Sequence, residues 1–596
     1  MIVAVDEMVW DLSQLVDSTN LASILKQLGN MVSEAEGLRN KYHGKIGGLN
    51  PKGVLELLEL KDAFTLRFEG AVRYGQFMYG ADSTNETAKQ VSHAVRNALM
   101  KTGQALAFVD IELGKLFASR PSLVKDRALN IYRHYLERIL RRVPHMLSET
   151  EEKLIITKDR NGVNSWETLH GDWLSTRMFT LDIKGKKTTV PFGQIAGLYE
   201  SPDRDLRRQT STIVHGDLGK DEIVWASAMR AICEDHLEMC EVRNWPNPMA
   251  QSLIDNDVDE KTVNSLMKTI QNSTGMYQEY LEMKAKLMGL PRLADYDLRA
   301  PLPKSPEKTY SWMEARREIS SAYRKFDAQI GEWIDEMYNK HHIDGKVRKG
   351  KSPGAWCSSW LSGKSAYILQ SYNERITDVY TQAHELGHAI HAYLCSRAQK
   401  PSNCEVGSCV AETGSLFGEL LLTEHLLEKM KTREEKQTIL TIVLDKFGMS
   451  AFQVSARVFF EQSLYDTIKK GTFLDGETDA KLWMAARDKI SGDAVEWLDM
   501  HKWNWTTTPH YFIANYRFYN YPYVFAQLFV YSLYRLYKEE GKAFVPKMKA
   551  LLAAGSSKSP LELSKELGFD ITNEAFWQKG MKQAQEFISS LQETMQ

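Results

Sequence analysis

Positions 384–388 read His-Glu-Leu-Gly-His, and this pentapeptide constrains the chain more than any other segment. Side chains four residues apart lie on the same face of an α-helix, so His384 and His388 can bind one Zn²⁺ together. Glu385 lies between them in the sequence, where its carboxylate can reach a water on that metal. The pentapeptide therefore predicts the catalytic core of a zinc peptidase.

The residues around the pentapeptide indicate one long helix. Apolar residues recur every three or four positions from 378 to 395, and Asp378 is a suitable N-cap. His391 extends the line of His384 and His388 along a neighbouring stripe. Each of three histidines on one side of a purely structural helix would need a polar partner, so this stripe favours a functional site.

A catalytic zinc needs a third protein ligand and leaves its fourth position to water. The extended metzincin pattern is excluded, because His391 and Leu394 stand where that pattern requires glycine and histidine. A second helix is predicted from about residue 406 to 427, after a break at 401–403. Three glutamates are candidates for the third ligand: Glu405, Glu412 and Glu419.

Glu412 and Glu419 are seven residues apart and share a helix face. The residues near them include Ala411, Gly414 and Ser415, whose small size is typical of a face packed against another helix. One glutamate could bind the metal while the other orients a histidine of the pair. The residues alone leave this choice open.

The segment from Trp503 to Phe529 is rich in tyrosines and also contains His510. Each buried tyrosine hydroxyl needs a hydrogen-bond partner, which makes a large number of tyrosines a costly way to fill a core. Peptide hydrolysis on zinc develops a negatively charged oxygen, which a tyrosine hydroxyl or an imidazole N–H can stabilise. This segment is therefore predicted to contribute to catalysis.

Composition excludes several other classes. The chain has 75 basic and 77 acidic residues, so nucleic-acid binding is not expected, and the basic turn at 346–352 is interpreted as a solvated loop. No apolar run reaches about 18 residues, so no membrane association is expected. The first residues lack the pattern of a signal peptide, and the six cysteines contain no Cys-x-x-Cys pair. We expect a cytoplasmic protein, and its oligomeric state stays open.

Helical periodicity dominates the chain, and its length of 596 residues implies at least two lobes. Strand signals are confined to a hairpin over 178–191 around Lys184-Gly185-Lys186 and a short strand at 366–370. A division is expected near residue 190, between an N-terminal helical lobe (1–190) and a catalytic domain (191–596). Helices are predicted over 17–43, 52–80, 85–118, 123–142, 203–241, 259–289, 308–339, 406–430, 433–470 and 521–553.

The run from Asp378 to His391, followed by Val410 to Glu419, resembles the M3 family of metallopeptidases, and within it the oligoendopeptidase F branch. The likeness extends over about residues 120 to 580. It implies that Glu412 is the third zinc ligand and that Glu419 supports a histidine ligand, with one Zn²⁺ per chain. It also implies a mainly α-helical, elongated, two-lobed body with a deep central substrate channel and a small β-sheet beside the zinc site.

The resemblance assigns further roles outside the metal ligands. Tyr516 and Tyr523 match the two tyrosines of the family's catalytic loop, and His510 matches its histidine with an offset of one residue. His510 and Tyr523 are then expected to stabilise the oxyanion, and Tyr516 to hold the substrate. The remaining expected substrate contacts are Tyr519, His391 and the strand residues Ala366, Tyr367 and Ile368, whose backbone would pair with an extended peptide.

These observations predict a zinc endopeptidase for short peptides, with Glu385 as general base. One alternative is a carboxypeptidase or peptidyl-dipeptidase on a related helical scaffold, which would need a cation for the substrate C-terminus; Arg517 is the candidate. Another is a peptide-binding protein stabilised by structural zinc. A structural site usually has four protein ligands and has no need of Glu385, which argues against this second alternative.

Overall fold

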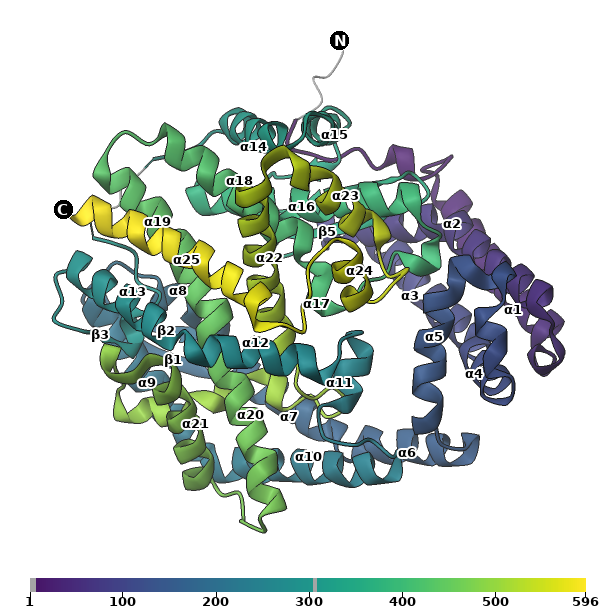
Figure 1. The fold of residues 1–596 in the computed structure, drawn as a ribbon, viewed down its shortest axis with the longest axis horizontal. Helices are drawn as coiled ribbons and strands as arrows, with labels where there is room; N and C mark the ends of the chain where they lie inside the picture. The colour runs from purple at the N-terminus through teal and green to yellow at the C-terminus, as the bar shows by residue number, and fades with distance from the viewer. Residues whose placement is uncertain (1–6, 304–307) are drawn as a thin grey trace. The chain divides into compact units, whose positions relative to one another are not determined.

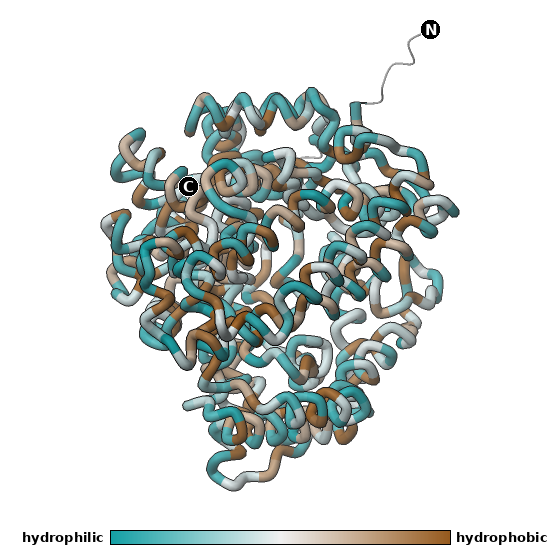
Figure 2. Tube along the Cα trace, turned by 90° about the vertical axis from the view of Figure 1, so that its right-hand side faces the viewer, coloured by the Kyte–Doolittle hydropathy of each residue, from teal (hydrophilic) through white to brown (hydrophobic). Residues whose placement is uncertain are grey.

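The computed structural model describes residues 7–303 and 308–596 and divides the chain into two compact units. Both units consist mainly of α-helices with small sheets, as predicted (Figure 1). Along single helices, hydrophobic residues recur between hydrophilic ones, which is the pattern of helices that bury one face (Figure 2).

Unit 1 combines Met1–Val143, Glu307–Lys429 and Leu536–Phe569. Its sheet contains β4 (Ile343–Asp344), β5 (Trp356–Trp360) and β6 (Ser365–Leu369). Its helices are α1 (Leu21–Tyr42), α2 (Pro51–Ala81), α3 (Glu86–Leu106), α4 (Phe108–Ser119), α5 (Arg133–Arg142), α14 (Trp312–Phe326), α15 (Ala328–Asn339), α16 (Ile376–Ala398), α17 (Ser408–Ala411), α18 (Thr413–Lys429), α23 (Val545–Ala554), α24 (Pro560–Glu566) and the end of α22 (Tyr521–Glu540).

Unit 2 combines Pro144–Pro306, Met430–Arg535 and Asp570–Gln596. Its strands are β1 (Met178–Ile183), β2 (Lys186–Pro191), β3 (Leu293–Ala294) and β7 (Val495–Glu496). Besides most of α22, its helices are α6 (Glu149–Asn161), α7 (Asn164–Thr176), α8 (Ile195–Tyr199), α9 (Arg204–Leu218), α10 (Glu222–Val242), α11 (Ala250–Asp255), α12 (Glu260–Asn272), α13 (Thr274–Leu287), α19 (Arg433–Phe447), α20 (Val454–Lys469), α21 (Gly476–Ser491) and α25 (Glu574–Met595).

The chain passes between the units near residues 143, 306, 429, 535 and 569. A single division near residue 190 therefore does not coincide with these compact units. The division into 1–190 and 191–596 stays a prediction about the domains of the sequence.

Several of the predicted long helices are broken in two. The helix expected over 308–339 ends at Phe326, because the side chain of Asp327 caps a new helix by accepting from the backbone N of Ile330. The helix expected over 433–470 is instead continuous from Arg433 to Lys469, with a π-helical stretch at Gly448–Gln453. Periodicity continues across such breaks and does not reveal them.

The stretch Arg433–Lys469 is the one segment of the described chain that is long and apolar enough to cross a membrane. However, 72% of its most apolar window is buried inside the protein, as in the core helix of a globular unit. Within unit 2, α19 packs beside the C-terminal helix α25, which accounts for part of this burial (Figure 1).

Both predicted strand regions are confirmed. β1 and β2 pair antiparallel, and the two-residue turn between them places Lys184 and Gly185 at φ of 55° and 77°, as a type I′ turn requires. In unit 1, β6 covers the predicted strand at 366–370. Strands β4 and β5 and the short β3–β7 pair are not predicted from the sequence.

The basic turn at 346–352 is not simply solvated. Lys351 is 2% exposed and its Nζ lies 2.7 Å from the carboxylate of the buried Asp344. Arg348 binds the same carboxylate at 2.8 Å. These two cations therefore stabilise the turn beside β4.

Candidate metal centre and active site

The site begins with the contact between α16 and α18. A Cβ at Gly387 would lie 2.3 Å from the backbone O of Gly414, and a Cβ at Gly414 would lie 2.4 Å from the backbone O of Gly387. Only glycine permits this approach, so the two helices touch backbone to backbone one residue before His388. The small residues predicted to mark a packed face do so, and Glu412 immediately precedes α18.

Glu412 meets both histidines of the pentapeptide. Its Oε2 lies 3.2 Å from Nε2 of His384 and 3.4 Å from Nε2 of His388. Atoms bound to one tetrahedral zinc at about 2.0 to 2.2 Å lie about 3.3 to 3.6 Å apart. The three side chains, grouped as a possible metal site, therefore fit Zn²⁺.

Two further side chains fix this geometry. Glu419 Oε1 lies 2.6 Å from Nδ1 of His384, the ring nitrogen that faces away from Glu412. Ser415 Oγ donates to Oε2 of Glu412 at 2.6 Å. Glu405, the third candidate from the sequence, is exposed and outside this group.

Asp378 also supports α16, although not at the expected N-cap. The helix begins at Ile376, and the Asp378 carboxylate accepts from the backbone N of Arg375 and of Asn373 at 3.1 and 2.8 Å. The carboxylate thus closes the first turn from within the helix.

The pKa values of the two glutamates nearest the histidines are shifted in opposite directions. Burial alone would raise the pKa of Glu412, but its hydrogen bonds with His384 and His388 hold this pKa far below its usual range. Glu385 is 6% exposed, and burial raises its pKa, while the neighbouring histidines oppose the change. Glu412 therefore suits a ligand that stays ionised, and Glu385 suits a group that takes up and releases a proton.

A cavity of about 440 Å³ adjoins these residues within unit 1. Its lining includes the histidine pair, Glu385, Glu412, His391 and residues of β5. Burial and the nearby His388 lower the pKa of His391 to about 4, so His391 is neutral and can act as a hydrogen-bonding wall group. Cys404 lines the cavity too, but its Sγ lies 3.1 Å from that of Cys395 and outside the metal group.

The strand expected to bind substrate needs correction. Ala366, Tyr367 and Ile368 lie in β6, the central strand of the order β4-β6-β5, and are fully buried. β5 occupies one side of β6 along its whole length, and β4 occupies the other at Ile368 and Leu369. An extended peptide therefore cannot pair with β6, whereas β5 is an edge strand that lines the cavity.

The predicted catalytic residues of the aromatic segment lie together in unit 2. Tyr523 OH lies 3.5 Å from Nε2 of His510, and Tyr523 is 42% exposed. Tyr519 contacts both rings and also that of Tyr516, with centroids 4.9 to 5.8 Å apart. Tyr516 OH accepts a hydrogen bond from Asn256 at 2.9 Å. Burial, and then the charge of Arg457, lowers the pKa of His510 to about 4.

Other residues of this segment have structural roles. Tyr521 is fully buried and donates to the backbone O of Ser252. Arg517, the candidate for binding a substrate C-terminus, is 3% exposed and lies 3.2 Å from Glu461. Its Nε also donates to Tyr465 OH at 2.8 Å, so Arg517 is occupied inside unit 2.

The helix that carries the His-Glu-x-x-His pentapeptide packs against a second helix, and one carboxylate beside that second helix meets both histidines. This arrangement defines the active site of a metallopeptidase. The sequence profile described as Peptidase family M3 matches residues 198–583, and that described as Oligopeptidase F matches residues 92–176. The chain belongs to peptidase family M3, in its oligopeptidase F branch, and is a metallo-endopeptidase.

Relatives and solved structures agree with this assignment. The chain is 23% identical over 564 residues to oligopeptidase PepF of Bacillus subtilis, covering 93% of this chain and 83% of PepF. It is also 23% identical to the group B oligopeptidase PepB of Streptococcus agalactiae, covering 95% and 93%. The fold resembles a Chlamydophila abortus protein described as a peptidase (TM-score 0.88, 20% identity, 99% of each chain) and Enterococcus faecium oligoendopeptidase-F (0.68, 20%, 96% and 98%).

Proposed function

We propose that this protein is a zinc-dependent oligoendopeptidase that hydrolyses internal bonds of short, unstructured peptides. The observation that carries the proposal is the position of Glu412 Oε2, 3.2 and 3.4 Å from the two histidine nitrogens, with Glu385 between the histidines in sequence. One Zn²⁺ per chain would be held by His384, His388 and Glu412. When bound, such an ion makes water a stronger acid and polarises a carbonyl group.

Glu385 acts as the general base in this proposal. Its buried carboxylate accepts a proton from the attacking water and later gives it to the leaving amine. Burial raises the pKa of this carboxyl group, which favours its uptake of the proton.

We assign substrate alignment to β5. Its residues line the cavity next to Glu385, and in the described chain one of its edges has no strand partner. An extended peptide added at that edge would gain main-chain hydrogen bonds, which require little of the side chains. His391 is then a wall of the same cavity.

The aromatic segment is proposed to complete the site. His510 and Tyr523 would stabilise the oxyanion, while Tyr516 and Tyr519 would contact the substrate. The mutual approach of these four rings supports their acting as one group.

Endopeptidase and exopeptidase action are separated by digesting a mixed peptide library and identifying the products by mass spectrometry. Internal cuts at varied distances from both termini support the endopeptidase. Cuts at a fixed distance from one terminus contradict it.

Elemental analysis should find one zinc ion per chain. Fractionation of cells should recover the protein from the cytoplasm.

A further inference from the structure

Unit 2 contains a second cavity, of about 410 Å³, that the proposed mechanism does not use. Three arginines line it, namely Arg299, Arg457 and Arg487, together with a single carboxylate, Asp295. The volume lies within the usual range for small-ligand sites, about 300 to 1,000 Å³. Its apolar lining residues include Phe192, Ile195, Val214, Leu298, Met449 and Trp497.

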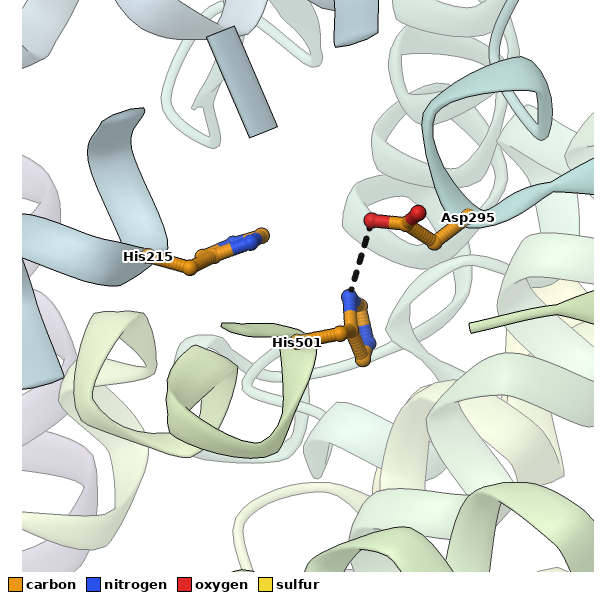
Figure 3. A group of neighbouring side chains, drawn as sticks. All are labelled: His215, Asp295 and His501. Carbon is orange, nitrogen blue, oxygen red and sulfur yellow. Dashed lines mark hydrogen bonds and ion pairs between the residues drawn. The ribbon is translucent and has the colours of Figure 1, made fainter. Parts of the chain in front are cut away.

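One oxygen of the carboxylate in this cavity, Oδ2 of Asp295, is already engaged by neutral donors. Figure 3 shows Asp295 beside His501, with His215 facing them across a gap. Asp295 Oδ2 lies 3.2 Å from Nδ1 of His501 and accepts from Ser211 Oγ at 2.6 Å. Ser211 Oγ in turn lies 3.2 Å from Nδ1 of His215, so one chain of hydrogen bonds joins the group.

His215, Asp295 and His501 are close enough to hold a metal ion, but their surroundings disfavour a cation. Both ring nitrogens of His215 are already engaged, because Asn504 Nδ2 lies 2.8 Å from its Nε2. Burial lowers the pKa of His215 to about 3, so this ring is neutral. One carboxylate and three guanidinium groups leave the cavity with a net positive charge, which would repel a metal ion.

The arginines, in contrast, have no counter-ion among the residues that the structure describes. Within the described chain, the guanidinium of Arg457 has neither a hydrogen bond nor an ion pair, and its buried Nε is unsatisfied. Arg487 is 5% exposed; its Nη1 donates to the side chain and backbone of Gln453, and its buried Nε is also unsatisfied. A guanidinium group that is withdrawn from water without a counter-ion is costly, so a site that holds two such groups is suited to an anion from outside.

We propose that this cavity binds a carboxylate with an apolar body, through the guanidinium groups of Arg457 and Arg487. The most natural source is a peptide. Arg457 interacts electrostatically with both Tyr523 and His510, the residues assigned to the oxyanion. Arg299, which is exposed, gives the cavity a positive entrance.

The identification of that carboxylate as part of a substrate rests on the proposed function, but the binding site itself does not. The carboxylate has three possible sources: a peptide C-terminus, an acidic side chain within a peptide, or a free small acid. Binding measured without hydrolysis distinguishes them.

The experiment uses the Glu385→Gln enzyme loaded with zinc and isothermal titration calorimetry. Four probes are compared: a hexapeptide ending in phenylalanine as the free acid, its C-terminal amide, the amide with one internal glutamate, and 3-phenylpropionate. A free acid that binds at least tenfold more tightly than its amide indicates the C-terminus. Tight binding of the glutamate-containing amide indicates an acidic side chain, and saturable binding of 3-phenylpropionate alone indicates a small acid.

Whichever preference is found, Arg457→Gln should abolish it without lowering Tm, because the wild-type guanidinium has no partner to lose. Arg292→Gln is the matched control, since Arg292 is exposed and outside the cavity. The proposal is overturned if no probe shows a carboxylate preference or if the preference survives Arg457→Gln. Residual hydrolysis by the Glu385→Gln enzyme would instead count against the proposed function and leave the binding result intact.

Discussion

The carboxylate of Glu419 lies 2.6 Å from Nδ1 of His384, while Glu412 approaches Nε2 of the same ring at 3.2 Å. A hydrogen bond at Nδ1 keeps the proton on that nitrogen and leaves the Nε2 lone pair for a metal. One imidazole is thus oriented from both sides, by two glutamates seven residues apart in sequence.

Replacing this support should weaken metal binding. We expect Glu419→Gln to lower zinc affinity about 10- to 100-fold, because the amide is a poorer partner for the imidazole N–H. Competition with a chromogenic chelator measures the change. Glu428→Gln, an exposed position on the same helix, serves as the control and should have no effect. Equal affinity of the two variants would contradict the supporting role.

Glu385→Gln should abolish hydrolysis and leave the metal bound. The amide keeps the shape of the side chain but cannot accept a proton from water. Turnover and zinc content are measured on the same preparation. More than a small fraction of wild-type turnover would show that Glu385 is not the base.

Tyr523→Phe removes a hydroxyl from a side chain that is 42% exposed, so stability should change little. If the hydroxyl stabilises the oxyanion, its loss should raise the free energy of the transition state by about 2 to 4 kcal/mol. The value of kcat should then fall roughly a hundredfold or more. Tyr42→Phe, remote in the sequence, is the control. A change confined to KM would assign Tyr523 to substrate binding.

The glycine contact between α16 and α18 has its own test. Gly387→Ala should destabilise unit 1 and reduce metal affinity, because the new methyl group would lie 2.3 Å from the carbonyl of Gly414. Gly37→Ala in α1 is the matched control. A Cβ added at Gly37 would meet nothing within 4 Å. The substitution should therefore raise the stability of the helix by about 0.5 to 1 kcal/mol. Thermal unfolding and chelator competition measure both effects.

The parts of the site that the sequence predicts correctly are those that depend on local interactions. Four-residue spacing on one helix places His384 and His388 together whatever the rest of the chain does. The choice among three glutamates is not local, since it depends on how closely two helices approach. The contact of Gly387 with Gly414 brings the two helices close enough for Glu412 to approach the histidines. In the sequence, the small residues indicate only that a close contact is present.

The substrate strand illustrates a different limit. The apolar run from Ala366 to Leu369 predicts a strand correctly, but a continuous apolar run also indicates burial between neighbours. Such a strand has little backbone left for a substrate. The edge strand β5 reads Trp-Cys-Ser-Ser-Trp and gives a weak strand signal because it is half buried.

Arginines show the same dependence on tertiary structure. Arg517 was the candidate for a substrate carboxylate, yet it is paired with Glu461 in the core of unit 2. Arg457, sixty positions earlier, has no counter-ion in the described chain. Nothing in the local sequence distinguishes a paired from an unpaired arginine.

The last prediction is a limit on the conformation of the substrate. Pairing with the edge of β5 requires an extended backbone of several residues next to Glu385. A folded domain can present such a strand only by unfolding locally, which costs several kcal/mol. One cleavable segment should therefore be cut efficiently as a free peptide of about a dozen residues and spared in a loop of a stable folded protein. Trypsin, which should cut both forms, is the control for exposure of the loop. Efficient cleavage of the folded form by this enzyme would refute alignment on β5, even if the zinc chemistry were correct.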